Sequence, residues 1–227
     1  VLVALLAPLA VAPFYGEAEG WAVGETALAA GGGGAALWFT NRPKREIQIR
    51  DGFAIVALAW IVVSLVGALP FVLTGTLGYT DAFFETISGF TTTGATILGG
   101  DATPAIEALP NAFLFWRSLA HWIGGMGIIV LTLAVLPLLG IGGMQLFKAE
   151  VPGPTADKLT PRVRDTATRL WGIYAGFTVL NALLLLPEMS LFDAVNHAIS
   201  SMATGGISTE NGSVGQYGSA YVEWVTD

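Results

Sequence analysis

The sequence predicts an all-α integral membrane protein, and three observations carry this prediction. The first is composition: 53% of the 227 residues are hydrophobic and only 12% are charged, and the mean hydropathy of +0.65 is too high for an ordinary soluble domain. The second is a set of runs with at most one charged residue, each about long enough to cross a hydrocarbon core of roughly 30 Å. These runs are 21–40, 53–73, 118–147 and 170–187.

The third observation is the position of the charges. Nine of the ten Lys and Arg residues fall within 42–50 and 148–169, and the positive-inside rule places both segments in the cytoplasm. The segments 74–111 and 187–227 contain no Lys or Arg but do contain carboxylates, so we expect them to lie outside and to present negative charge. The chain has no cysteine, which excludes disulfides and thiolate metal sites.

Residues 1–41 are expected to form an N-terminal transmembrane helix pair whose first helix is cut short. The stretch 1–14 could also be the core of a signal peptide, but no basic region precedes it and the hydrophobicity resumes at once. The sequence begins without Met and stops at "YVEWVTD" (221–227) with no closing pattern. We therefore interpret it as a fragment of a longer polytopic protein.

Residues 42–147 are expected to form a first repeat. The run 53–73 leaves the cytoplasm and 112–147 must return to it, so 74–111 begins and ends outside. Within that segment "DAFFETISGF" (81–90) favours a helix too short to span the membrane. We expect a short helix that dips into the membrane and a loop that climbs back out, which requires protein or water to satisfy its backbone. A plain external loop is the alternative.

An internal repeat favours the re-entrant interpretation. Residues 81–96, "DAFFETISGFTTTGAT", align without a gap with 193–208, "DAVNHAISSMATGGIS", at an offset of 112 residues. The repeating unit is helix, short helix, glycine-containing loop and helix. Residues 148–169 are then a cytoplasmic linker, and 170–227 are a second repeat that stops before or within its last helix. The identical pairs are Asp81/Asp193, Ala82/Ala194, Ile87/Ile199, Ser88/Ser200, Thr92/Thr204 and Gly94/Gly206.

Such a loop suits a monovalent cation. A short helix whose C-terminal end points into the membrane directs the negative end of its dipole at a central cavity. Carbonyl oxygens of the following "TTTGA" or "TGGI" backbone can replace the hydration shell of a weakly hydrated ion. Glycine supplies the conformations that let successive carbonyls point the same way. The loops hold no carboxylate, which argues against tight divalent binding.

Three segments resemble the potassium-uptake transporters of the Trk/Ktr superfamily: "SGFTTTGAT" (88–96), "HWIGGMGI" (121–128) and "SMATGGIST" (201–209). The extra N-terminal pair resembles the TrkH branch of that family. The resemblance covers essentially the whole chain. It implies a K⁺-channel-like fold of four covalently linked helix–pore-loop–helix repeats around one pore, of which this chain holds the first and most of the second. It also implies potassium uptake across the plasma membrane of a bacterium or archaeon, with potassium as substrate and no covalently bound cofactor.

On this resemblance each repeat contributes one strand of a selectivity filter that coordinates K⁺ through backbone carbonyls. The resemblance further implies a homodimer and a cytoplasmic, TrkA-type nucleotide-binding ring as regulator. The Pro-broken stretch 151–162 is then either a docking surface for the ring or a solvated loop. No nucleic-acid partner is expected. The filter residues are expected to be Thr92, Thr93, Gly94 and Ala95 in the first repeat and Thr204, Gly205, Gly206 and Ile207 in the second.

Polar residues outside the loops have structural interpretations. Arg117 and His121 stand four residues apart on the returning helix and share a face. Arg117 is expected to act as a clamp near the short helix by pairing with Glu85 or Glu107, or else to snorkel. No second ligand stands at a useful spacing from His121, so we expect an interface histidine and not a metal ligand. His197, aligned with Glu85, is expected to pack or to form a hydrogen bond.

Two glycine runs have a structural interpretation, and two functions other than ion transport stay open. "GGMG" (124–127) and "GGGG" (31–34) lack the preceding strand and the lysine of a phosphate loop, and they favour close helix packing or a bend. Ser88 with His121 or His197 leaves open an intramembrane serine hydrolase, although the chain has no nucleophile motif. A non-conducting structural membrane subunit is the other alternative.

Overall fold

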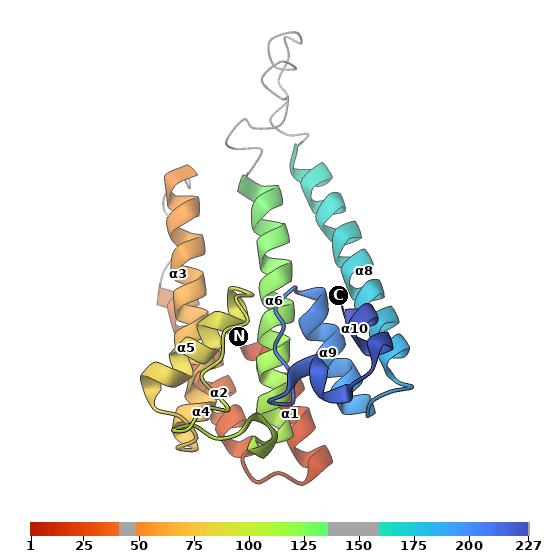
Figure 1. Cartoon of the computed structure of the whole chain (residues 1–227). Coiled ribbons are helices and arrows are strands. Elements are labelled where there is room, and N and C mark those ends of the chain that lie inside the picture. The colour runs from red at the N-terminus through yellow and green to blue at the C-terminus, as the bar shows by residue number, and fades with distance from the viewer. Residues whose placement is uncertain (41–48, 136–158, 227) are drawn as a thin grey trace.

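The computed structural model describes residues 1–40, 49–135 and 159–226, and every regular element within those ranges is a helix (Figure 1). The absence of strands among these residues agrees with the predicted all-α class. The elements are α1 (Leu2–Tyr15), α2 (Gly20–Thr40), α3 (Ile49–Gly67), α4 (Leu69–Leu73), α5 (Tyr79–Phe90), η1 (Ile106–Ala108), α6 (Asn111–Val135), α8 (Leu159–Leu185), α9 (Leu191–Met202), η3 (Ser213–Tyr217) and α10 (Ala220–Thr226).

The N-terminal helices form an antiparallel pair that packs against the rest of the bundle. Helix α1 ends at Gly16, whose φ of 69° is the left-handed conformation that commonly closes a helix. Helix α1 contacts both α2 and α6. The turn between α1 and α2 carries Glu17, whose carboxylate accepts hydrogen bonds from the backbone N–H of Asn111 and, at 3.0 Å, from that of Ala112. Glu17 thereby caps α6, a contact that the sequence did not indicate.

The long helices α3, α6 and α8 stand side by side, and a short helix lies in each gap (Figure 1). Helix α5 packs between α3 and α6, and α9 packs between α6 and α8. With 12 residues each, α5 and α9 are only about 18 Å long, too short to cross a bilayer. Their bounds, Tyr79–Phe90 and Leu191–Met202, differ by the offset of 112 residues found in the sequence alignment.

Two segments have helix boundaries that the hydropathy pattern did not indicate. The apolar run 53–73 is not one helix: α3 stops at Gly67 and α4 begins at Leu69, because Pro70 has no N–H to donate to the preceding turn. The indole N–H of Trp116 donates to the carbonyl of Gly67, the last residue of α3, at 2.9 Å. The predicted linker 148–169 is helical from Leu159 onward as the start of α8, and its residues 148–158 lie outside the described residues.

Apolar side chains fill the bundle and also cover part of its outside. Trp116, Phe71, Phe90 and Phe113 are buried where α4, α5 and α6 meet, whereas Trp171 and Phe177 on α8 are exposed. Within the described residues, one helical stretch, 165–185, is both long and apolar enough to cross a membrane. The predicted runs 21–40 and 118–147 are helical in α2 and, as far as residue 135, in α6.

Candidate functional site

Each short helix ends in the same backbone motif. Thr92 N–H donates to the Gly89 carbonyl at 3.0 Å and Thr93 N–H to the Ser88 carbonyl at 2.9 Å. In the second repeat Thr204 N–H donates to the Ser201 carbonyl at 2.8 Å and Gly205 N–H to the Ser200 carbonyl at 3.1 Å. This pair of bonds is a Schellman motif, which usually has glycine at the left-handed position. Here both repeats place a threonine there.

The loops that follow, 91–98 (the first loop) and 203–210 (the second loop), have matching dihedral angles. Thr92 and Thr204 have φ values of 54° and 55°, and Gly94 and Gly206 both have φ of 75°. Positive φ is uncommon for any residue other than glycine and is strained for a β-branched one, at a cost of order 1–3 kcal/mol. The same strain at two aligned threonines makes these loops the candidate functional site. All four residues are among the filter residues expected from the sequence, but an unusual backbone conformation was expected only at the glycines, because threonine normally avoids positive φ.

The two loops touch each other at glycines. A Cβ on Gly94 would collide with the carbonyl oxygen of Gly205 and would lie 3.0 Å from its carbonyl carbon. Two constraints therefore require glycine at position 94: its positive φ, and the Gly205 carbonyl that occupies the space of a Cβ. A Cβ on Gly206, in contrast, would have nothing within 4 Å among the described residues. The structure thus brings the predicted segments 92–95 and 204–207 into contact at Gly94 and Gly205.

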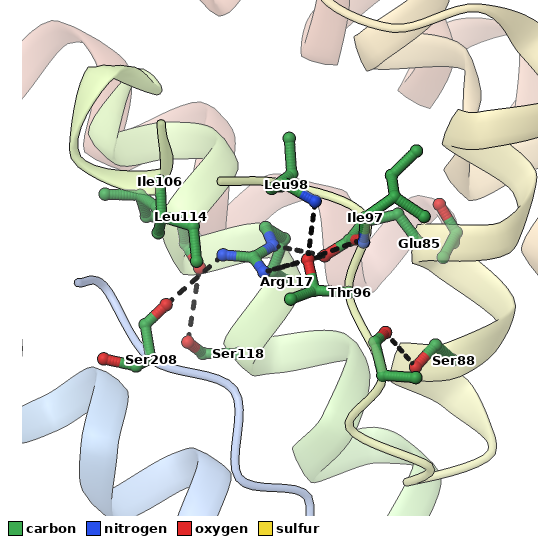
Figure 2. Close-up of polar contacts among 12 residues, drawn as sticks. Glu85, Ser88, Thr96, Ile97, Leu98, Ile106, Leu114, Arg117, Ser118 and Ser208 are labelled. Atoms are coloured by element: carbon green, nitrogen blue, oxygen red, sulfur yellow. Dashed lines mark hydrogen bonds and ion pairs between the residues drawn. The ribbon is translucent and has the colours of Figure 1, made fainter. Parts of the chain in front are cut away.

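Arg117 joins the first short helix to both loops (Figure 2). Its guanidinium forms an ion pair of 2.7 Å with Glu85, and both side chains are nearly fully buried. The same guanidinium donates to the Thr96 hydroxyl at 3.2 Å and, across the repeats, to the Ser208 carbonyl at 3.3 Å. Of the two partners proposed from the sequence, Arg117 pairs with Glu85. Glu107 instead accepts hydrogen bonds from the backbone and side chain of Asn211 at 2.6 and 2.7 Å.

The contacts around Glu85 recur in the second repeat with other residues. Thr96 donates to both Glu85 carboxylate oxygens at 2.9 Å and accepts from Leu98 N–H at 3.1 Å. In the second repeat the Ser208 hydroxyl lies 3.5 Å from the Nε2 atom of His197 and accepts from Glu210 N–H at 3.0 Å. His197, expected to pack or hydrogen-bond, does both, since it also contacts the Tyr217 ring edge-on at 5.6 Å.

The serines of the two repeats differ. The Ser88 hydroxyl donates to the Ala95 carbonyl at 2.6 Å (Figure 2), whereas the buried Ser200 hydroxyl has no hydrogen-bond partner among the described residues. One lone pair of the Ala95 carbonyl is therefore already used, and one remains for another ligand. Ser88 is occupied in this way, and among the described residues its hydroxyl forms no hydrogen bond to His121 or His197, so neither of the Ser88–histidine pairs considered from the sequence is formed.

The glycines of "GGMG" pack closely, as predicted. A Cβ on Gly124 would collide with the Phe90 carbonyl at the end of α5, and one on Gly125 would lie 2.8 Å from the Tyr174 hydroxyl. A Cβ on Gly127 would lie 2.6 Å from the Trp60 ring. In "GGGG", a Cβ on Gly31 would lie against Leu2, whereas a Cβ on Gly32, Gly33 or Gly34 would meet no atom within 4 Å among the described residues. The described residues contain no group of His, Asp and Glu that could hold a metal ion.

Carboxylates line a hollow of about 480 Å³ at the end of the bundle that the charge pattern places outside. Its lining includes Glu107, Asp193 and Glu210 with the aromatic Phe14 and Tyr15. Hydrogen bonds from the backbone of Asn211 lower the pKa of Glu107, whereas burial raises the pKa of Glu210. The hollow is negatively charged and holds no basic side chain among its described lining.

Comparison with known proteins identifies the family. The sequence model of the family TrkH, described as a cation transport protein, matches residues 26–227. The chain belongs to the TrkH family. It is 47% identical over 226 residues to the Trk system potassium uptake protein TrkH of Salmonella typhimurium, covering 97% of this chain and 46% of that protein. It is 49% identical over 199 residues to the TrkH protein of Halomonas elongata, covering 86% of this chain and 40% of that protein.

A solved TrkH structure has the same fold. The crystal structure of the potassium transporter TrkH from Vibrio parahaemolyticus matches with a TM-score of 0.83 and 41% identity, covering 99% of this chain and 45% of that one. The chain therefore spans about half the length of the TrkH proteins that it matches. The predicted class, an all-α integral membrane protein of the K⁺-channel-like TrkH type, is confirmed by this match.

Proposed function

We propose that the protein takes up potassium through a membrane pore, and that the first and second loops are two strands of its selectivity filter. The names of its TrkH relatives, which are potassium uptake proteins and a potassium transporter, support the choice of ion. The observation that carries the mechanism is the matched strain: positive φ at Thr92 and Gly94 and again at Thr204 and Gly206, on two loops in contact.

Such a backbone suits ion coordination. Positive φ at every second residue turns successive peptide planes so that neighbouring carbonyls can point to one side of the strand. A ring of these oxygens replaces the hydration shell of K⁺. We assign this role to Thr92, Thr93 and Gly94 and to Thr204, Gly205 and Gly206. Ala95 and Ile207 complete the strands, and the Ala95 carbonyl is shared with the Ser88 hydroxyl.

Arg117 and Glu85 hold the strands in place in this proposal. An unpaired guanidinium beside a filter would repel the cation that the filter must bind. The Glu85 carboxylate neutralises that charge at 2.7 Å, while the remaining guanidinium hydrogens bond Thr96 of one strand and the Ser208 carbonyl of the other. The pair therefore acts as a clamp without adding net charge. The carboxylates of the outer hollow then raise the local concentration of cations at the pore entrance.

The charge pattern and the TrkH resemblance support proposals for the membrane, the topology and the partners of the protein. We place the protein in the bacterial or archaeal plasma membrane, the inner membrane where there are two, with several crossings and with 42–50 and 148–169 in the cytoplasm. The basic linker supports docking of a cytoplasmic nucleotide-binding ring, and the TrkH resemblance supports a homodimer. Residues 148–158 lie outside the described residues, so this part of the proposal rests on the sequence.

Growth and uptake experiments test the function. A bacterium that lacks potassium uptake should grow on limiting potassium when it carries the full-length protein, and its rubidium uptake should be inhibited by potassium far more than by sodium. Failure to support growth at a normal protein level would exclude potassium uptake. Labelling of the purified protein by a serine-reactive probe, blocked by Ser88→Ala, would instead favour the hydrolase.

A further inference from the structure

One face of α6 runs along both loops. Four residues on three successive turns of this helix contact the site: Arg117 bonds Thr96 and Ser208, His121 lies against Gly205, and the adjacent Gly124 and Gly125 lie against the ends of α5 and α9. Helix α6 is therefore the element that joins the two repeats, as its central position between α5 and α9 also shows (Figure 1).

His121 has no role in the proposed mechanism so far. Its side chain is completely buried, with an exposed fraction of 0%. Neither ring nitrogen has a hydrogen-bond partner of normal geometry among the described residues, although the Ser88 backbone interacts with the ring. A buried imidazole without hydrogen bonds is costly, so another requirement must keep this ring in place.

The ring occupies the space of a missing side chain. A Cβ on Gly205 would collide with the Nδ1 atom of His121 and would lie 2.6 Å from Cε1 and 2.7 Å from Cγ. Gly205 is not among the residues with positive φ, so its backbone conformation does not require glycine. Glycine is required at position 205 because the imidazole of His121 occupies the space of a Cβ. The carbonyl of the same residue, Gly205, lies against Gly94 of the first loop.

We propose that His121 is a positioning residue that sets the spacing between the two filter strands. Its ring packs against the Gly205 backbone, and Gly205 in turn contacts Gly94. The ring therefore fixes where the carbonyls of both strands lie. This inference rests on the proposed filter function of the loops. Ion preference depends on the placement of those carbonyls, so the volume of the ring at position 121 determines how well potassium is distinguished from sodium.

Space-compensating variants test this proposal in the full-length protein. Gly205→Ala introduces the collision and should let sodium inhibit rubidium uptake about tenfold more strongly, as a disturbance near 1.4 kcal/mol implies. His121→Ala removes the support and should shift the same ratio in the same direction. The double variant His121→Ala/Gly205→Ala places the new methyl in the vacated space. Its sodium inhibition should lie closer to that of the parent than either single variant does.

The outcomes separate this inference from the function on which it rests. Restored discrimination in the double variant supports it, and so does restored protein level if Gly205→Ala alone fails to accumulate. Effects that simply add in the double variant, or a His121→Ala protein with the parent's ion preference, would overturn the role of His121 while leaving the filter intact. If Gly94→Ala and Gly205→Ala both keep the parent's ion preference at normal protein levels, the filter assignment itself fails.

Discussion

Arg117 and Glu85 form an ion pair of 2.7 Å in which the two side chains are 2% and 0% exposed. Neither charge has access to water, so each depends on the other for its stability. Removing one partner of a buried pair leaves an uncompensated charge and typically costs about 3–5 kcal/mol, whereas replacing both can be nearly neutral. The pair therefore makes a sharper prediction than a surface ion pair would.

We expect Glu85→Gln and Arg117→Met each to lower the midpoint of thermal unfolding of the detergent-purified protein strongly, in line with a loss of about 3–5 kcal/mol. The double variant should lose less than the sum of the two. Glu85→Gln should also lower potassium uptake more than Arg117→Met does, because it leaves a positive charge beside the filter. Asp101→Asn, which changes an exposed carboxylate, is the control. Additive losses would show that the two residues act independently.

The glycines of the two loops should respond differently to alanine. Gly94 and Gly206 share a φ of 75°, so each substitution costs roughly 1–2 kcal/mol in backbone strain. Gly94→Ala also collides with the Gly205 carbonyl, and Gly206→Ala meets no described atom within 4 Å. We therefore expect both to weaken discrimination against sodium in rubidium uptake, and Gly94→Ala to weaken it more.

A matched control for these variants is Gly176→Ala in α8, where an added Cβ has open space and φ is ordinary. Gly125 is unsuitable, since a Cβ there would lie 3.2 Å from Ala203 at the start of the second loop. Gly176→Ala should keep both the protein level and the ion preference. Equal effects of the Gly94 and Gly206 substitutions would mean that the contact between the strands does not matter.

The cap that Glu17 provides to α6 should be measurable. Glu17→Ala removes an acceptor for the N–H groups of Asn111 and Ala112 and a negative charge at the positive end of the helix dipole. We expect a loss of about 1 kcal/mol, seen as a lower unfolding midpoint. Glu19→Ala, in the same turn but without such a contact, is the control. Equal midpoints for the two variants would exclude the cap.

Thiol labelling in intact cells tests the orientation. A cysteine at Gly215 should react with an impermeant reagent from outside, because this glycine is exposed and has room for a side chain. It is a better position than Ser213, whose φ of 51° is strained. A cysteine at Thr155, which lies outside the described residues, should react only after the cells are opened. The reverse pattern would overturn the topology and the re-entrant loops.

Glu210 should make stability depend on pH. Burial raises its pKa, so the folded state favours the neutral carboxyl. Its contribution to stability is then fully present below the ordinary pKa of Glu and is lost as the pH rises through the raised value. Glu107, with a lowered pKa, acts in the opposite direction. We expect Glu210→Gln to raise the unfolding midpoint at pH 7 and to have little effect at pH 4. A gain that does not vary with pH would contradict this explanation.

Local sequence features predicted the parts of the fold that depend on residues close together in the sequence. The alignment at an offset of 112 residues located α5 and α9 with matching bounds. The break before Pro70 depends on a local feature too, the missing N–H of proline, which a hydropathy pattern does not detect. Contacts across the repeats had no such signal. The Arg117–Ser208 hydrogen bond joins residues 91 apart in sequence. The sequence also does not show why a loop position requires glycine: Gly94 needs it for its positive φ, whereas Gly205 needs it because the His121 ring lies against it.

The spacing of the Arg117 contacts along the chain has a consequence for biogenesis. Glu85 precedes Arg117 by 32 residues, whereas Ser208 follows it by 91. When α6 leaves the ribosome, the carboxylate that neutralises its arginine has therefore already been synthesised, and the carbonyl in the second repeat has not. A lone arginine costs about 2.5–3.5 kcal/mol at the centre of an inserting helix on translocon scales, and Arg117, near the outer end of α6, bears a smaller part of that cost. The order of the two partners lets the Arg117–Glu85 pair enter the bilayer without net charge, and it leaves the Nη1 hydrogens of Arg117 available for the Ser208 carbonyl.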